Sequence, residues 1–289
     1  MPVRIAHLIT TYKCPVQLER LVDALAHKDA ACFIHVDGNV SLSEYLFLEK
    51  KDGVRLIKNR KRVVWGGYSF TEAILNSIEE IANSESKFDY INLLSSQDYP
   101  IKPIEEFVQF LTVHKGYSFI AYEGEDSSKW WKESTSRIYA YNLNDFKFRG
   151  KYFIQQVLNT FLPLRKFPML GKLYGSSCAT WWTMDMACAS YVLSFINSNK
   201  KLTRYMKFTW GADEFLLPSI VMNSPFAKLT LNNNLRYIDW SEGGSNPKIL
   251  GMKDLPSIKR SDNFFARKFD ILIDEKVLTA IDTEMLNYV

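Results

Sequence analysis

The chain has 289 residues, of which 47% are hydrophobic and 24% charged, so it can bury a sizeable core and is not globally disordered. Its net charge of +4 is too small to indicate a nucleic-acid partner, but it suits a polyanionic small ligand such as a nucleotide diphosphate. Four cysteines without CxxC spacing and four scattered histidines argue against a structural zinc site. With no signal peptide or apolar run long enough to span a bilayer, we expect a soluble, cytoplasmic protein in a reducing compartment.

The first 122 residues alternate between apolar strands and amphipathic helices. Strands are predicted at 4–10, 31–36, 54–57, 89–95 and 118–122. Helices are predicted to begin at Pro15, at the Ser41/Glu44 and Ser69/Glu72 capping boxes, and at Pro103. This alternation indicates βαβ units in an α/β fold with a mostly parallel central sheet, whose ligands sit beyond the carboxyl ends of the strands.

The second half is less regular, and residues 123–175 are rich in aromatic and charged side chains. Helices are predicted near 153–161, at 185–197, at 215–222 and from 274 onward, and strands at 177–184 and 235–238. No linker or repeat interrupts the chain. We therefore expect one domain over 1–289, with a nucleotide-binding half at 1–122 and an acceptor-binding, catalytic half at 123–289.

The residues His35, Val36 and Asp37 end the second predicted strand. A histidine and an aspartate at a strand end can hold a ribose or a base. These three residues are therefore candidates for binding the nucleotide of a donor substrate, which we call the donor site. The alternative is a β-turn built on Asp37-Gly38.

A basic run at 58–62, which includes Arg60, is followed by Trp65-Gly66-Gly67. Glycine lets the backbone approach a ligand closely, so Arg60, Trp65 and Gly66 are further donor-site candidates, with a solvated surface as the alternative. Neither GxxxxGK[ST] nor GxGxxG occurs here, which disfavours a P-loop or a dinucleotide-binding site.

Asp98 follows the most apolar predicted strand, where it can orient a hydroxyl of the donor sugar. Its alternative role is that of a loop aspartate accepting backbone N–H groups. Farther along, Arg267 and Lys268 can neutralise a leaving diphosphate, or they form a surface charge pair.

Two acids, Asp213 and Glu214, open a short apolar helix. Asp213 suits a helix N-terminus, where negative charge is stabilised, and it can also contact an acceptor. Glu214 is the candidate catalytic base that takes a proton from an acceptor hydroxyl, with a pKa that aromatic neighbours can raise.

Aromatic residues make up 14% of the chain, a high proportion that suits a sugar-binding cleft. Trp240 follows a predicted strand and is a candidate stacking platform for a sugar ring. Trp131 and Trp182 are two further acceptor-site candidates. The alternative for Trp240 is packing in the core at the end of that strand.

Seven short motifs occur in a defined order along nearly the whole chain. They are HVD at 35–37, WGG at 65–67, LSSQDYPIK at 94–102, GSS at 175–177, DEFLLPSIVMNS at 213–224, LRYIDW at 235–240 and RKFD at 267–270. This ordered set resembles the core-2/I-branching β-1,6-N-acetylglucosaminyltransferase and xylosyltransferase family, glycosyltransferase family 14. Residues 123–175 lie outside the motif match.

The resemblance implies a GT-A-like fold and transfer with inversion at the anomeric carbon. The family lacks the Asp-x-Asp metal motif, and here too the strand ends in Ser96-Gln97-Asp98, so the resemblance implies no metal or other cofactor. It also implies a nucleotide-sugar donor. By position, Glu214 resembles the family's base, Lys268 its diphosphate lysine and Trp240 its acceptor-contacting tryptophan.

In one respect the chain departs from the family, because a diphosphate-binding arginine is replaced by Ser245. Lys248, Arg236 or Arg260 are possible substitutes. UDP-GlcNAc is the first expected donor, with UDP-xylose and others left open.

The resemblance further implies a bacterial relative that acts on a glycan, or a lipid-linked glycan, in surface polysaccharide synthesis. The segment 200–208 is a candidate for peripheral contact with the inner face of the membrane. No nucleic-acid partner is expected.

Two alternatives remain open on the sequence alone. The first is a non-catalytic protein that binds a nucleotide or a glycan on the same fold. The second is a hydrolase with paired carboxylates, which requires Asp98 to face the same cleft as Glu214.

Overall fold

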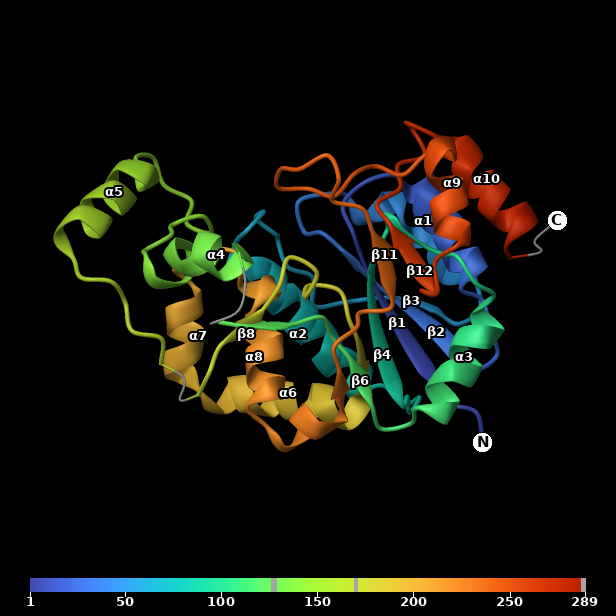
Figure 1. Ribbon diagram of the computed structural model, residues 1–289, viewed down its shortest axis with the longest axis horizontal. Coiled ribbons are helices and arrows are strands. Elements are labelled where there is room, and N and C mark those ends of the chain that lie inside the picture. The colour runs from blue at the N-terminus through green and yellow to red at the C-terminus, as the bar shows by residue number, and fades with distance from the viewer. Residues whose placement is uncertain (126–128, 169–170, 287–289) are drawn as a thin grey trace.

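A seven-stranded sheet forms the centre of the computed structural model, which describes residues 1–125, 129–168 and 171–286 (Figure 1). The strand order is β10-β6-β9-β4-β1-β2-β3. The strands are β1 Ile5–Thr11, β2 Ala30–Val36, β3 Val54–Leu56, β4 Tyr90–Ser95, β6 Ser118–Phe119, β9 Thr183–Asp185 and β10 Thr230–Leu231. All neighbours pair in parallel except β9, which is antiparallel to both β4 and β6. The predicted α/β class with a mostly parallel sheet is confirmed.

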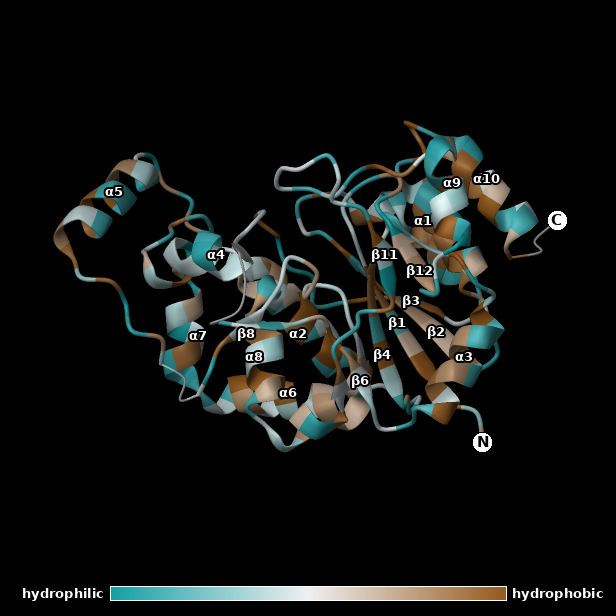
Figure 2. Ribbon diagram, viewed as in Figure 1, coloured by the Kyte–Doolittle hydropathy of each residue, from teal (hydrophilic) through white to brown (hydrophobic). Residues whose placement is uncertain are grey.

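Helices cover both faces of this sheet because its strands are apolar on both sides. In β1, Ile5 and Ile9 point into one core, which also contains apolar residues of α1, α3, α9 and α10. Ala6 and Leu8 point into the other, with α2, α6 and α8. Figure 2 shows hydrophobic residues along these central strands. The helices are α1 Pro15–Ala24, α2 Tyr68–Ala82, α3 Ile104–Val113, α4 Lys129–Tyr139, α5 Lys151–Phe161, α6 Met186–Ser198, α7 Lys200–Met206, α8 Leu216–Met222, α9 Leu255–Lys259 and α10 Glu275–Glu284.

Both predicted capping boxes are wrong. The Ser41 hydroxyl pairs with that of Ser43 at 2.7 Å, and two 3₁₀ helices, Leu42–Glu44 and Leu46–Lys50, replace the expected α-helix. Helix α2 begins one residue before Ser69. The distant Asp145 caps it, accepting the Ser69 N–H at 3.0 Å and the Ser69 hydroxyl at 2.7 Å. A tertiary contact thus supplies the cap that the local pattern assigned to Ser69.

A second, three-stranded sheet positions residues 265–268 near the end of β4. Its order is β11-β12-β5, with strands β11 Arg236–Ile238, β12 Phe265–Arg267 and β5 Asp98–Pro100. Strand β12 pairs antiparallel with β5, so Arg267 lies opposite Asp98. The N–H of Phe269 then donates to the carbonyl of Gln97 at 2.8 Å. Lys268 is thereby held at the carboxyl end of β4, where a parallel sheet places its ligands.

A two-stranded sheet, β7 Glu123–Gly124 and β8 Tyr174–Gly175, joins the ends of the segment that contains α4 and α5. Helix α4 was not predicted. Within the described ranges, no helix is long and apolar enough to cross a membrane.

Candidate active site

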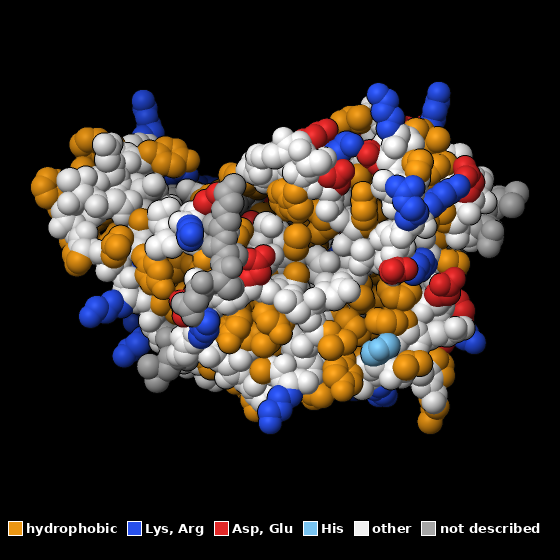
Figure 3. All heavy atoms as spheres, in the orientation of Figure 1, with side chains coloured by type: hydrophobic (Ala, Val, Ile, Leu, Met, Phe, Trp, Pro, Cys, Tyr) orange, Lys and Arg blue, Asp and Glu red, His pale blue; other side chains and the backbone are white. Residues whose placement is uncertain are grey.

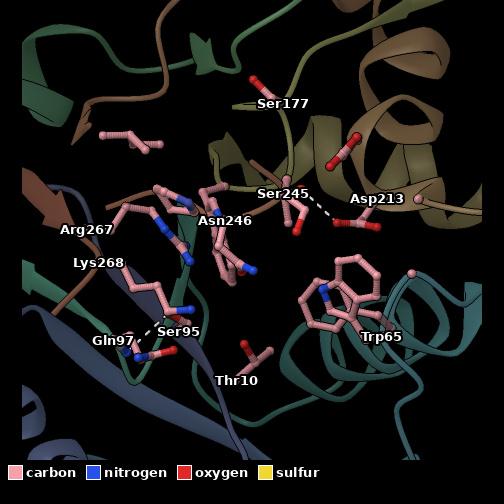
Figure 4. A pocket seen from close by; sticks show the side chains of 18 of the residues that line it. Thr10, Trp65, Ser95, Gln97, Ser177, Asp213, Ser245, Asn246, Arg267 and Lys268 are labelled. Atoms are coloured by element: carbon pink, nitrogen blue, oxygen red, sulfur yellow. Dashed lines mark hydrogen bonds between the residues drawn. The ribbon is translucent and has the colours of Figure 1, made fainter. Parts of the chain in front are cut away.

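A pocket of about 880 Å³ lies at the carboxyl ends of β1, β2 and β4. Strand ends line its floor, at Thr10, His35 and Ser95–Gln97. Figure 4 shows Arg267 and Lys268 on one side of the pocket, Asp213 and Trp65 on the other, and Ser245 and Asn246 between them. Its volume suits a ligand of nucleotide-sugar size.

Glu214 lines this pocket at the end of a 3₁₀ turn, Ala212–Glu214, that follows Gly211 in a left-handed conformation. Its Oε2 accepts the indole N–H of Trp130 at 3.3 Å and a guanidinium N–H of Arg137 at 3.1 Å. Burial, then the charge of Asp213, raise the pKa of Glu214 to about 7, against the lowering effects of Arg137 and Trp130. A carboxyl group with a pKa near neutrality is well matched to general-base catalysis.

Asp213 also lines the pocket, and its Oδ2 accepts the hydroxyl of Thr180 at 2.7 Å. Burial raises the pKa of this carboxyl, while the Thr180 hydrogen bond opposes the rise. Two adjacent acids in one desolvated site resist ionising together, so the charge of Asp213 keeps the Glu214 proton affinity high.

Trp130 and Arg137, which the sequence did not single out, donate hydrogen bonds to Glu214, and Trp210 packs against Arg137. Arg137 lies over the Trp210 ring at 4.2 Å, and the Trp65 ring meets Trp210 edge-on at 5.1 Å. All three line the pocket. Trp130 and Arg137 belong to α4, in the region without a motif match, so only tertiary structure identifies them.

Gly66 has a left-handed φ of 70°, and its carbonyl accepts the Gly211 N–H at 2.8 Å. A Cβ at this position would lie 2.3 Å from Nε1 of Trp210. We therefore predict that Gly66→Ala lowers the free energy of unfolding by about 2 kcal/mol or more, from backbone strain plus overlap with Trp210. Urea unfolding measures this change.

The matched control is Gly116→Ala, because Gly116 also has positive φ but a Cβ there meets nothing within 4 Å. It isolates the backbone term, so the two variants should differ. Equal losses would show that Trp210 accommodates the added methyl group.

Arg267 and Lys268 provide the positive side of the pocket. Arg267 is 7% exposed, pairs with Asp98 at 3.3 Å and stacks over the Trp181 ring at 4.0 Å. Burial, followed by the charges of Arg267 and Lys13, lowers the pKa of Lys268. Among the described residues, the Lys268 ammonium has no ion-pair or hydrogen-bond partner, which leaves it available to an anion in the pocket.

Asp98 does not line the pocket, contrary to the role predicted for it. Its side chain is buried, accepts the Ser95 hydroxyl at 2.8 Å and pairs with Arg267. It therefore positions Arg267 from behind and does not reach a donor sugar itself. The hydrolase alternative required Asp98 to share the cleft with Glu214, and this arrangement is not found.

Val36 and Arg60 also lie outside the pocket lining, unlike His35, Asp37, Trp65 and Gly66. Arg60 donates to the carbonyls of Val36 at 2.8 Å, Asp37 at 2.7 Å and Val40 at 2.8 Å. Its guanidinium thus fixes the loop after β2, and the Val36 side chain is fully buried.

His35 and Asp37 sit at the carboxyl end of β2, on the pocket floor. The Nε2 of His35 accepts the Lys61 N–H at 3.0 Å, and burial lowers the pKa of the ring to about 4. His35 is therefore neutral at physiological pH, with its proton on Nδ1. Asp37 uses Oδ1 to accept the Asn39 N–H at 2.8 Å, which is the turn geometry that was the alternative role.

The three tryptophans predicted for an acceptor site separate in the structure. Trp240 lines the pocket, and its buried Nε1 has no hydrogen-bond partner among the described residues. Trp131 and Trp182 are 5% and 1% exposed and belong to the core. The Trp131 N–H donates to the carbonyl of Glu123 at 2.9 Å. These two indoles pack the fold and do not contact the pocket.

None of the three substitutes proposed for the arginine missing at Ser245 reaches the pocket, although Ser245 does. Lys248 is bound to Asp254 at 2.6 Å, and Arg260 contacts Ser257 at 3.2 Å. Arg236 is buried against the carbonyls of Leu93 and Trp182. Two arginines line the pocket: Arg267, on the side of Lys268, and Arg137, beside Glu214.

Across the described ranges, no group of three or more His, Cys, Asp or Glu side chains is placed to hold a metal ion.

The chain is similar to proteins of one enzyme family. A family model, Core-2/I-Branching enzyme, matches residues 5–259. Xylosyltransferase 1 of Rattus norvegicus is 25% identical over 98% of this chain and 35% of its own length. Xylosyltransferase of Ciona intestinalis is 24% identical over 98% of this chain and 34% of its own length. The chain thus spans about a third of these curated relatives.

Among solved structures, mouse Xyloside xylosyltransferase 1 in its apo form aligns over 92% of this chain and 97% of its own, at 10% identity and a TM-score of 0.39. That likeness is distant. The family match, by contrast, covers most of the chain and includes the pocket residues from Thr10 to Pro247. The chain therefore belongs to the Core-2/I-Branching enzyme family, a family of glycosyltransferases with a GT-A-like α/β fold.

Proposed function

We propose that this chain transfers a sugar from a nucleotide diphosphate donor to a hydroxyl of a glycan, with inversion at the anomeric carbon. One observation carries the proposal. Glu214, whose pKa is raised to about 7, faces the same pocket as Lys268 and Arg267. A base for the acceptor and cations for a leaving diphosphate are the two groups that such a displacement needs.

In the proposed reaction, Glu214 accepts the proton of the acceptor hydroxyl as its oxygen attacks the anomeric carbon. The bond between that carbon and the diphosphate breaks on the opposite side, and the diphosphate departs with the electron pair. Lys268 and Arg267 stabilise the negative charge that develops on it. Trp240 offers an aromatic face to the acceptor, and His35 and Asp37 lie where the nucleoside would bind.

The donor we propose is a UDP-sugar. UDP-GlcNAc is the first donor to test, and UDP-xylose is the second, because two relatives are named xylosyltransferases. For the acceptor we propose a glycan, first a lipid-linked precursor of a bacterial surface polysaccharide. A thermal-shift screen of nucleotide sugars, followed by transfer assays with those that bind, tests the proposal. Binding without any transfer would favour the non-catalytic alternative.

We also propose that transfer needs no metal ion, because Lys268 and Arg267 line the pocket where a diphosphate would be neutralised. The expected result is a transfer rate in EDTA equal to that in buffer alone. The assay compares EDTA with added Mn²⁺ or Mg²⁺ under the same conditions. A rate that falls in EDTA and returns with Mn²⁺ would overturn this part of the proposal alone.

A further inference from the structure

Helix α5, Lys151–Phe161, packs with its polar side inward and its apolar side outward. The side-chain oxygen of Gln155 accepts the Leu143 N–H at 2.8 Å. Asn159 bonds the Tyr141 N–H at 2.8 Å and the Tyr141 carbonyl at 2.9 Å. None of its residues is buried. This reverses the usual amphipathic arrangement, in which the apolar stripe faces the core.

The outward side of α5 carries large apolar side chains that are exposed. Phe153, Val157 and Phe161 recur at four-residue spacing, which places them on one side of the helix, and Phe153 and Phe161 are 71% and 80% exposed. Other exposed apolar side chains extend the surface on and beside the helix: Phe148, Ile154 and Leu164. Figure 3 shows several separate groups of exposed hydrophobic side chains at the end of the molecule where Figure 1 places α5. We call these six residues the α5 apolar surface.

The surroundings of this surface are basic. Residues 146–168 contain Lys147, Arg149, Lys151, Arg165 and Lys166 and no acidic residue. Lys151 and Arg165 are occupied by backbone carbonyls, of Asn144 and of Ile138. Lys147, Arg149 and Lys166 are exposed. An exposed aromatic helix flanked by free cations has the composition of a segment that lies in the interface of an anionic lipid bilayer.

The segment 200–208, which the sequence suggested for membrane contact, is less suitable. Helix α7 occupies most of it, and its Leu202 and Met206 are buried in the core. That segment can add positive charge through Lys200 and Lys201, but its apolar side is already covered.

We propose that the α5 apolar surface and its basic flanks dock this protein onto an anionic membrane. The charge pattern favours lipid over a second copy of the chain, because a symmetric dimer through α5 would bring the two basic flanks together. Helix α4 contributes Trp130 and Arg137 to the pocket and leads directly into the segment that carries α5. Docking would therefore hold the pocket next to the lipid surface. Membrane docking does not depend on the transfer activity.

Co-sedimentation with vesicles of equal parts phosphatidylglycerol and phosphatidylcholine tests the proposal. The wild-type chain should pellet with these vesicles and not with phosphatidylcholine alone. Phe153→Ser with Phe161→Ser should lower the partition coefficient at least about tenfold, since two aromatic anchors are lost. Lys147→Glu with Arg149→Glu should lower it by a similar factor in dilute salt, and less in concentrated salt.

A matched control is Leu272→Ser with Ile273→Ser, which removes two side chains that are 83% and 65% exposed elsewhere on the molecule. It should bind vesicles like the wild type. All variants should melt like the wild type, because the changed side chains are exposed. Equal binding of the Phe153/Phe161 variant and the wild type would overturn the proposal. So would a concentration-dependent dimer that this variant abolishes in the absence of lipid, since the surface would then be a protein interface.

Discussion

Replacing Glu214 by Gln is expected to lower the rate of sugar transfer by roughly 10²- to 10⁴-fold, the contribution typical of a general base. Glutamine keeps the shape of the side chain and can still accept from Arg137, but it cannot take the acceptor proton. The affinity for UDP should stay the same, because the base does not touch the diphosphate side of the pocket. Single-turnover transfer and UDP titration measure the two effects separately.

The chain provides a matched control in Glu133, an acid of α4 that lines the same pocket. Glu133→Gln removes the same charge from the same cavity, so it shows what a general electrostatic change does to the rate constant. We expect that variant to keep kcat within a few-fold of the wild type. A Glu214→Gln enzyme with near-wild-type kcat would refute the assignment of the base.

The same carboxyl predicts a specific pH dependence. Because the pKa of Glu214 is raised to about 7, the wild-type transfer rate should rise as pH increases through about 7, where the base becomes ionised.

The raised pKa of Glu214 also makes the stability of the protein depend on pH. The ordinary pKa of this side chain is 4.5, so the folded state holds the proton more tightly than the unfolded chain does. The contribution of this group to stability is therefore present below pH 4.5 and is lost as pH rises towards 7. In Glu214→Gln that loss should disappear from unfolding curves measured across this range.

Removing Arg137 should move the pH profile in a defined direction. Its charge lowers the pKa of Glu214, so Arg137→Gln should shift the rising limb of the rate profile to higher pH. Rates measured across the alkaline range test this effect. A profile that keeps its midpoint while the rate falls would indicate that Arg137 acts on the acceptor instead.

Strands and pocket residues can be predicted from the sequence where the local pattern and the tertiary position coincide. Strands β1, β2 and β4 are runs of apolar residues buried on both faces, so their existence and the polar residues at their ends follow from the chain alone. His35, Glu214, Trp240 and Lys268 were selected as site candidates, and the structure brings all four to one pocket.

Site residues cannot be predicted from the sequence where a polar side chain stabilises the fold instead of binding a ligand. Arg60 and Asp98 follow strand ends, as ligand-binding residues do, but each turns back to satisfy groups of the protein itself. Nothing local separates an aspartate that meets a sugar from one that positions an arginine. Trp131 and Trp182 are similar cases, since a tryptophan in the core and one in a cleft have the same local sequence signal. Arg137 is identified as a site residue only by its contact with Glu214 in the folded protein.

Replacing Lys268 by Ala is expected to lower transfer by roughly 10²- to 10³-fold, the effect typical of removing one donor to a developing oxyanion. The affinity of the Lys268→Ala variant for UDP should fall at least about tenfold, because a hydrogen bond to a charged group contributes roughly 1.5–3 kcal/mol. Its affinity for uridine should stay unchanged, because uridine has no phosphate. Since burial lowers the pKa of Lys268, binding of an anion should raise that pKa again, and UDP should bind with proton uptake at alkaline pH.

The control is Lys248→Ala, which tests the substitute that the sequence suggested for the missing arginine. Lys248 is bound to Asp254 and does not line the pocket, so its loss should leave the UDP affinity nearly unchanged. If Lys268→Ala weakened UDP and uridine equally, the lysine would be supporting the nucleoside end or the fold. If Lys248→Ala alone weakened UDP, the diphosphate would bind along the 239–248 loop. A loss specific to UDP in Lys268→Ala places the diphosphate beside Arg267, on the side of the pocket that Asp98 holds in position from behind.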